Sequence, residues 1–390
     1  YTVKDTLSLH DALPISPGAP TILGPILHLD DATSWRGGQQ QVLYLHQGLR
    51  AADVDSRVVC RRGSALHERL CDEQLPHYAL EHMSAHDLVV ARTLARIVHD
   101  HPRAILHAHT SHAHELALWA HRLGAGRPVV VSRRVDFPVA RTWWSGRKYR
   151  SRRVRRYLAI SSAVEEELRR AGIEDDRIRR VPSGIDLTRF DDLEPDHAWK
   201  RSLGLAPGEL LFGSIAALAD HKDQVTLLRA FARFRERGGT GRLVVIGEGE
   251  LRGSLEALRH ELGLDEVVAL PGFTPHVLPR LAAFDIFVLT SKKEGLGTSI
   301  LDAMAAGRPV LATRAGGIVD AVVDGESGRL APVGDVDAIA DTMAQLQSSA
   351  VLRQRLAHGA RERVKEFDVR VTVERTRAAY TEVLEDAAAS

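Results

Sequence analysis

The stretch Ser291-Lys-Lys-Glu-Gly-Leu-Gly-Thr-Ser-Ile-Leu-Asp-Ala-Met-Ala-Ala-Gly-Arg-Pro-Val310 is the most informative part of this sequence. It follows an apolar run typical of a strand, turns on Gly295 and Gly297, and enters a helical pattern in which Thr298 and Ser299 suit the N-cap region. Free backbone N–H groups at such a helix start form a site for a phosphate. The stretch therefore predicts a strand, a phosphate-binding turn and a helix of an α/β sheet.

Two carboxylates flank this helix start. Glu294 precedes the helix and Asp302 follows eight residues later, inside it. Both can approach a ligand over the helix start and accept hydrogen bonds from sugar hydroxyls. On spacing alone, a glycine turn with a surface acid at each end explains the pattern equally well.

Outward from this stretch, short apolar runs alternate with helical patterns, which predicts parallel sheets with crossover helices. In the first half we expect strands at Ile26–Asp30, Ser56–Cys60, Ala104–His109, Pro128–Ser132 and Tyr157–Ser161. The helices expected there are Gly38–Ala51, Asp87–Asp100, Ala113–Leu123 and Ala163–Ala171.

The alternation resumes after a turn cluster at 181–186 and an acidic segment at 191–196, where we expect a hinge. The strands expected in this second half are Leu211–Leu218, Leu243–Gly247, Val267–Leu270, Asp285–Ser291 and Pro309–Thr313. The helices expected there are Gln224–Arg237, Leu251–Leu262 and Thr298–Ala306, with three more after Asp335 that end in Val371–Ala387.

Composition narrows the functional class. The formal charge of +1 gives no global attraction to nucleic acid. No apolar run approaches the ~18 residues that span a bilayer, and the first residues lack a secretory pattern, so we expect a cytoplasmic protein. The two cysteines, Cys60 and Cys71, have no metal-ligand spacing, and we expect both as buried, reduced thiols.

The stretch at 291–310 resembles the Glu-x7-Glu signature of glycosyltransferase family 4, usually written EGFG…LEAMACGxPV. The matching positions are Glu294, Gly295, Gly297, Leu301, Ala303, Met304, Ala305, Gly307, Pro309 and Val310. The resemblance implies a GT-B fold, with two Rossmann-like domains facing across a cleft, and transfer from a nucleotide sugar with retention of configuration. It also implies that Glu294 contacts the transferred sugar and that Asp302, in place of the usual Glu, holds the nucleotide ribose.

The domain boundaries follow from the alternation and the resemblance together. We expect a non-native or disordered leader at 1–20 and an acceptor-side domain at 21–187. A nucleotide-sugar-binding domain at 188–368 follows, and a helix at 369–390 is free to pack back on the first domain. No cofactor is expected, because the nucleotide sugar is itself the substrate. The resemblance also implies catalysis without a metal, and no carboxylate is spaced to complete a site with the histidines.

The likeness extends from about Ile26 to Phe367 and implies further site residues. Gly37 and Gly38 correspond to a glycine turn whose amides meet the donor phosphates, although a glycine pair after a strand is also an ordinary loop. His109 corresponds to the second histidine of a His-x-His element. His107 and His109 point to the same face of a strand, so one of the two is open to a purely packing role.

Lys222 lies where the family has a lysine that neutralises donor phosphates, whereas Ala217 stands in place of the usual arginine. His221, Arg133 or Arg134 are candidate substitutes for that charge. Phe273, after Gly272, corresponds to a loop near the nucleobase.

A basic segment interleaved with aromatic residues runs from Arg133 to Arg156 and contains Trp143 and Trp144. This composition suits an anionic lipid surface or a phosphorylated glycan acceptor, and equally a solvated charged face. It also suits nucleic acid, but no recognised nucleic-acid module accompanies it.

We therefore predict a glycosyltransferase that moves a sugar from a nucleotide-sugar donor to a glycan or lipid-linked acceptor in cell-envelope biosynthesis. We expect the enzyme to associate peripherally with the inner face of the membrane. The predicted catalytic residues are His109, Lys222 and Glu294. A sugar-nucleotide epimerase of the same fold and a non-catalytic sugar-nucleotide or glycan-binding protein are the alternatives.

Overall fold

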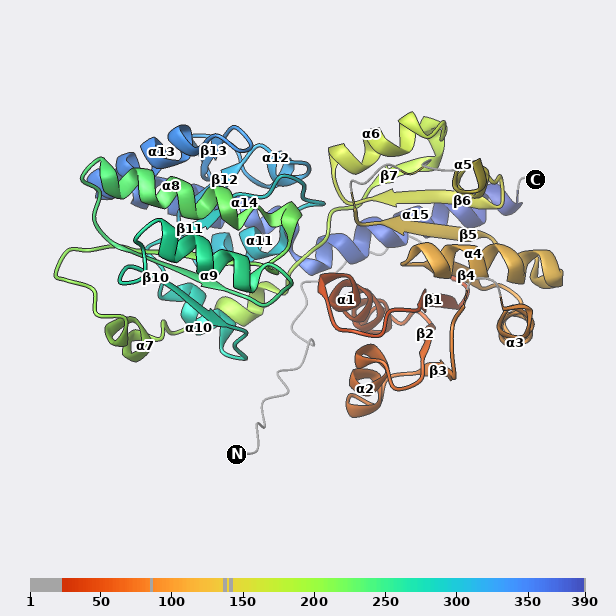
Figure 1. Ribbon diagram of the computed structural model, residues 1–390. Helices are drawn as coiled ribbons and strands as arrows, with labels where there is room; N and C mark the ends of the chain where they lie inside the picture. The colour runs from red at the N-terminus through yellow and green to blue at the C-terminus, as the bar shows by residue number, and fades with distance from the viewer. Residues whose placement is uncertain (1–22, 85–86, 136–138, 140–142, 389–390) are drawn as a thin grey trace. The chain divides into compact units, whose positions relative to one another are not determined.

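The computed structural model describes residues 23–84, 87–135, 139 and 143–388, without the side chains of residues 125 and 143–145. The leader expected at 1–20 lies outside the described residues. The chain divides into two compact units (Figure 1). One holds the residues up to Ser132 together with Ser151–Tyr157 and Val373–Ser390, and the other holds Arg133–Arg150 and Leu158–Thr372.

The N-terminal sheet has seven strands in the order β3-β2-β1-β4-β5-β6-β7. Its strands are β1 (Ile26–Asp30), β2 (Ser56–Arg61), β3 (His77–Leu80), β4 (Ile105–Ala108), β5 (Val129–Arg133), β6 (Val154–Ala159) and β7 (Ile178–Arg180). Strand β1 pairs in parallel with β2 and β4, and all five of its residues are buried. A strand covered on both faces needs an apolar run, which explains the clear sequence signal at β1.

Helices alternate with these strands, as a parallel sheet requires. They are α1 (Gly37–Ala51), α2 (Ala65–Asp72), α3 (Leu88–His99), α4 (Ser111–Ala120), the π-turn η1 (His121–Ala125), α5 (Trp143–Tyr149), α6 (Ser162–Arg170) and the 3-10 turn η2 (Asp175–Arg177).

The second sheet has six strands in the order β10-β9-β8-β11-β12-β13. They are β8 (Leu211–Ile215), β9 (Arg242–Ile246), β10 (Val268–Gly272), β11 (Ile286–Leu289), β12 (Val310–Thr313) and β13 (Arg329–Ala331). Phe212 of β8 packs edge-on against Phe231 and Phe234 of a neighbouring helix in the core of this sheet.

The remaining helical segments belong to this second half. They are η3 (Leu187–Phe190), α7 (His197–Ser202), η4 (Asp220–Lys222), α8 (Gln224–Glu236), α9 (Arg252–Glu261), α10 (Val277–Ala282), α11 (Thr298–Ala305), α12 (Ile318–Ala321), α13 (Val336–Ser348), α14 (Ala350–Val364), η5 (Lys365–Phe367) and α15 (Val369–Ala388). No helix among the described residues combines the length and the apolarity needed to span a membrane.

The last helix, α15, contacts N-terminal elements from Val373 onward. The Tyr380 hydroxyl lies 2.6 Å from Nδ1 of His107 on β4, and a Cβ on Gly48 of α1 would lie 2.5 Å from Val373. Arg156 of β6 donates to Glu382 at 3.0 Å and to Asp386 at 2.7 Å. These contacts bring the end of the chain to the unit formed by its beginning.

The two parallel sheets predicted from the sequence are confirmed, with corrections at single elements. The strand expected at Tyr157–Ser161 is wrong in its bounds, because β6 already begins at Val154. Its early residues include Arg155 and Arg156, and Arg156 is buried only because Glu382 and Asp386 neutralise it. A charged pair supplied by a distant helix cannot be read from a local apolar pattern.

Candidate functional site

The start of α11 is the centre of the candidate site. The N-cap is Gly297, with φ of +87° and no side-chain cap, so the expectation that Thr298 and Ser299 occupy the cap is wrong. A left-handed φ favours glycine at this turn. The amides of Ile300 and Leu301 donate to the Gly297 carbonyl. Among the described residues, no acceptor faces the amides of Thr298 and Ser299. Two open amides at a helix start are a site for an anion.

Gly295 lies in the same turn, and glycine is needed there because a side chain has no room. A Cβ there would come within 2.4 Å of the Arg134 carbonyl oxygen, so any larger residue would displace that backbone. Two of the predicted site residues, Gly295 and Arg134, therefore lie side by side.

Lys222 and Glu294 form an ion pair at this edge of the second sheet. Lys222 ends the turn η4, and its Nζ donates to Oε2 of Glu294. The two side chains are only 17% and 13% exposed, and Ser291 Oγ donates to the same carboxylate oxygen at 3.3 Å. Partial burial strengthens the attraction relative to a surface pair. The structure thus joins two residues, distant in sequence, that were predicted separately.

Asp302 lies on α11 with one carboxylate oxygen enclosed. Its Oδ1 has no hydrogen-bond partner among the described residues. Burial raises the pKa of Asp302 to about 6, against an opposing influence of the Arg189 charge. A buried acceptor without a donor is costly, and each such group in a native structure calls for an explanation such as a functional role.

Ala217 and Phe273 lie on other loops of this unit. Ala217 is exposed, and its carbonyl accepts a hydrogen bond from Gln224 Nε2 at 2.8 Å. Phe273 follows Gly272, whose φ is +82°, and the residue is 77% exposed. An exposed aromatic ring next to a strand end offers a stacking surface.

The N-terminal sheet presents a second helix start. Helix α1 begins at Gly37 after Arg36, which makes no side-chain cap, and the first amides bonded to Arg36 are those of Gln39 and Gln40. No acceptor among the described residues faces the amides of Gly37 and Gly38. A Cβ on Gly38 would meet nothing within 4 Å, so this helix start is open to a ligand.

His109 belongs to a buried histidine cluster. Its Nε2 lies 2.9 Å from Nδ1 of His28, whose Nε2 lies 3.1 Å from Ser56 Oγ. Ser56 Oγ also lies 2.7 Å from Nδ1 of His46, and burial lowers the pKa of His46 to about 4. His28 was not predicted, although a polar residue inside an apolar strand was a usable signal in the sequence. The structure places it in register with His107.

His107 has the packing role that the sequence left open for one of the two histidines. Its Nδ1 meets the Tyr380 hydroxyl and its Nε2 lies 2.8 Å from Ser132 Oγ. Both ring nitrogens are engaged inside the protein.

A pocket missed by the sequence analysis lies at the carboxyl ends of β1, β2 and β4. Thr110 Oγ1 donates to Asp31, and Nδ1 of His112 lies 2.9 Å from the same carboxylate. The pocket has a volume of about 480 Å³. Its lining residues are Asp31, Ala32, Thr33, Arg61, His82, Met83, Ser84 and His112. This is the edge at which open α/β sheets bind ligands.

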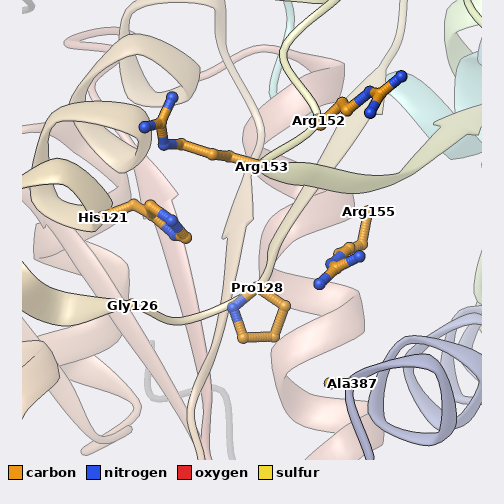
Figure 2. A pocket seen from close by; sticks show the side chains of 7 residues that line it. All are labelled: His121, Gly126, Pro128, Arg152, Arg153, Arg155 and Ala387. Atoms are coloured by element: carbon orange, nitrogen blue, oxygen red, sulfur yellow. The ribbon is translucent and has the colours of Figure 1, made fainter. Parts of the chain in front are cut away.

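The basic segment divides into paired and unpaired arginines. Arg133 donates to the Tyr149 hydroxyl at 2.9 Å and to the Val135 carbonyl at 3.0 Å, whereas the side chains of Trp143 and Trp144 lie outside the described residues. Figure 2 shows a pocket lined by Arg152, Arg153, Arg155, His121, Gly126, Pro128 and Ala387. Its volume is about 480 Å³. Those three guanidinium groups have no hydrogen-bond or ion-pair partner in the part of the chain that the structure describes.

Comparison with known proteins gives family matches on both halves. Residues 196–363 match the model "Glycosyl transferases group 1", and residues 35–189 match "Glycosyltransferase Family 4". The putative glycosyltransferase EpsD of Bacillus subtilis is 29% identical over 216 residues, which cover 55% of this chain and 56% of EpsD. The lipopolysaccharide core biosynthesis glycosyltransferase LpsE of Rhizobium meliloti is 31% identical over 183 residues, covering 43% of this chain and 54% of LpsE.

These alignments span about half the length of the curated relatives. Among solved structures, Anabaena HepE in complex with UDP superposes with a TM-score of 0.80 at 20% identity, covering 92% of this chain and all of HepE. At that identity the likeness shows the fold, and the GT-B prediction is confirmed.

Proposed function

The chain belongs to the glycosyltransferases of group 1 and family 4, and from that premise we propose that it transfers a sugar from a nucleoside diphosphate sugar to a cell-envelope acceptor. The observation that carries this proposal is the start of α11. The open amides of Thr298 and Ser299 begin this helix, Glu294 in the preceding loop pairs with Lys222 of η4, and Asp302 lies further along the same helix.

Each group has a role in the proposed reaction. The amides of Thr298 and Ser299 and the Lys222 ammonium stabilise the charge that develops on the departing diphosphate. Glu294 accepts hydrogen bonds from hydroxyls of the transferred sugar. Asp302 accepts from the nucleotide ribose, and Phe273 stacks on the base. Catalysis proceeds by positioning and electrostatics, with retained configuration, without a metal, and without an enzymic nucleophile.

His109 is the proposed contribution of the N-terminal sheet to the reacting sugar, with the open amides of Gly37 and Gly38 as further phosphate donors. The hydrogen bond to His28 fixes the His109 ring, which favours a defined orientation. For the missing charge at Ala217, Arg134 is the favoured substitute, because its backbone already lies against Gly295.

We assign the acceptor to the pocket around Asp31. Its carboxylate, Thr110 and His112 are groups that bind sugar hydroxyls, and they lie at the carboxyl edge of the N-terminal sheet. LpsE is named a lipopolysaccharide core biosynthesis glycosyltransferase, which favours a glycan or lipid-linked acceptor.

The test is incubation of the full chain with UDP-sugars, followed by other nucleotide sugars, with and without acceptor glycans. HepE was crystallised with UDP, which makes the uridine series the first choice. We expect acceptor-dependent release of nucleoside diphosphate. Conversion of the donor alone would favour an epimerase, and binding without turnover over a broad acceptor panel would favour a non-catalytic sugar-nucleotide protein.

The unpaired arginines of Figure 2 support a peripheral membrane association on the cytoplasmic side. Among the described residues no carboxylate pairs with Arg152, Arg153 or Arg155. Near an anionic surface each can contribute up to ~1 kcal/mol, an attraction that salt weakens.

Co-sedimentation with anionic and neutral vesicles at low and high salt tests this association. The parent should sediment with anionic vesicles at low salt, and a variant with Arg152, Arg153 and Arg155 changed to Gln should not. Equal sedimentation of both proteins would contradict the association and leave a solvated basic face.

A further inference from the structure

A cluster of metal-ligating side chains lies on α2 and β3, among residues that have no part in the proposed transfer. His67 and Cys71 lie one turn apart on α2, and His77 begins β3. The Cys71 Sγ is 3.6 Å from Nε2 of His67 and 3.7 Å from Nε2 of His77. The expectation that both cysteines are buried is therefore wrong for Cys71, which is exposed, and right for Cys60.

The packing of α2 explains why these side chains meet. Leu66 and Leu70 of α2 are buried in a core cluster with Val42, Val58 and Cys60. His67 and Cys71 each follow one of these leucines, so they form a second row beside the buried one, at the i, i+4 spacing of one helix face. A short turn then leads into β3, which pairs with β2 and brings His77 beside that row.

The spacing of the three atoms matches a metal site. In a tetrahedral zinc centre with Zn–S of about 2.3 Å and Zn–N of about 2.0–2.1 Å, sulfur and nitrogen lie roughly 3.6 Å apart. The observed separations are 3.6 Å and 3.7 Å, and all three ligand atoms lie within 4.8 Å of one another. We propose that His67, Cys71 and His77 bind a zinc ion, with the fourth position open to water or a solute.

The hydrogen bonds around the rings distinguish the two histidines. Nδ1 of His77 donates to the Leu75 carbonyl at 2.8 Å, which leaves the lone pair of Nε2 directed at the thiol. Metal-ligating histidines use such a carbonyl partner. Nδ1 of His67 instead accepts from the Gly63 amide at 3.2 Å, so in the neutral ring Nε2 carries the proton. Binding requires that ring to exchange tautomers and give up the Gly63 bond.

The bound ion would connect α2 to the edge strand β3 through its ligands. As the Zn–S bond forms, the Cys71 thiol releases its proton to solvent. The histidine group around His109 is a poorer candidate, because His107 is engaged by Ser132 and Tyr380 and the whole group is buried.

Cobalt titration of the untagged full chain tests the site, because tetrahedral Co²⁺ has visible d–d bands and thiolate ligation adds a near-ultraviolet charge-transfer band. We expect both bands in the parent and their displacement by zinc. Cys71→Ser should abolish the charge-transfer band and lower zinc affinity, measured by chelator competition, on the order of 100-fold. His77→Gln should lose more affinity than His67→Gln, because His77 is the oriented ligand.

The matched controls are Cys60→Ala, which removes the other thiol, and His99→Gln, which removes an exposed histidine of α3. Both should keep the parent's cobalt spectrum and zinc affinity, and circular dichroism verifies folding of every variant. Absence of a thiolate–cobalt band in the parent, or equal zinc affinity in the parent and Cys71→Ser, would overturn the proposal.

Discussion

At the start of α11 several polar groups have no hydrogen-bond partner among the described residues, whereas His28, His107 and His109 around β4 are all hydrogen-bonded. Thr298 and Ser299 have open amides, and Asp302 has an enclosed oxygen without a donor. His107, by contrast, has partners at both ring nitrogens. The difference teaches that unsatisfied groups mark a binding site better than residue type does, since histidine and carboxylate are both common in active sites.

The largest expected effect comes from Glu294→Gln. Loss of the carboxylate should cut turnover by about 10²–10³-fold, the size expected for one transition-state hydrogen-bonding group. UDP affinity should stay within a few-fold, because Lys222 loses its internal partner and becomes more available to phosphate. Steady-state transfer and calorimetric UDP binding measure the two effects.

Glu326→Gln, on an exposed carboxylate of the same sheet unit, is the control and should leave both quantities unchanged. Loss of UDP binding with turnover intact in Glu294→Gln would reverse the assignment of this residue.

Lys222→Met should weaken UDP binding by about 1.5–3 kcal/mol, the range of a hydrogen bond to a charged group. Because Lys222 and Glu294 contact each other, the double variant should be non-additive in a binding cycle. Lys365→Gln, which removes an exposed ion-paired lysine, serves as the control. Unchanged UDP affinity in Lys222→Met would remove the phosphate role.

Asp302→Asn should weaken nucleotide binding and raise folding stability. Nucleotide affinity should fall by roughly 1–3 kcal/mol if the carboxylate accepts from ribose hydroxyls. Folding stability should rise, because a folded-state pKa of about 6 means that the native protein binds more protons than the unfolded chain between about pH 4 and 6. The parent therefore loses stability as pH rises through that window, and above it the ionised carboxylate is a net cost.

Urea unfolding at pH 4 to 8 measures this prediction. The Asp302→Asn variant should show a flatter profile than the parent and greater stability at pH 7. Asp341→Asn, an exposed acid on α13, should follow the parent. Lower stability of Asp302→Asn at pH 7 would show that the enclosed carboxylate already has a stabilising partner.

The smallest effect is expected at the hydrogen-bonded histidines around β4. Tyr380→Phe removes the hydroxyl that meets His107 and should cost about 0.5–1.5 kcal/mol of unfolding free energy, the ordinary value of one hydrogen bond. Turnover at saturating substrates should not change. A large loss of turnover at unchanged stability would mean that the His107 network acts in catalysis.

The sequence predicts best where function and local structure use the same residues. Gly297 and the strand before it are readable because a turn with positive φ and a buried strand each leave a local signature. The cap at Gly297, in place of Thr298 or Ser299, was missed because a glycine N-cap leaves no side-chain oxygen to recognise.

Long-range partners could not be read in the same way. The Lys222–Glu294 pair, the His28–His109 bond and the burial of Arg156 each join segments far apart in the chain. Cys71 was expected to be buried because cysteine usually is, but on α2 it follows the buried row and faces solvent. Such placements depend on helix orientation, which periodicity alone does not fix.

Hydrogen–deuterium exchange with and without saturating UDP tests the central claim most directly, because the open amides of Thr298 and Ser299 are the proposed phosphate donors. UDP should slow exchange in peptides that cover 294–302, and this protection should weaken in Lys222→Met. Peptides around His107 should change little, because the backbone of β4 is already paired with β1 and β5 within the sheet. Tight UDP binding with no added protection at 294–302 would contradict the account.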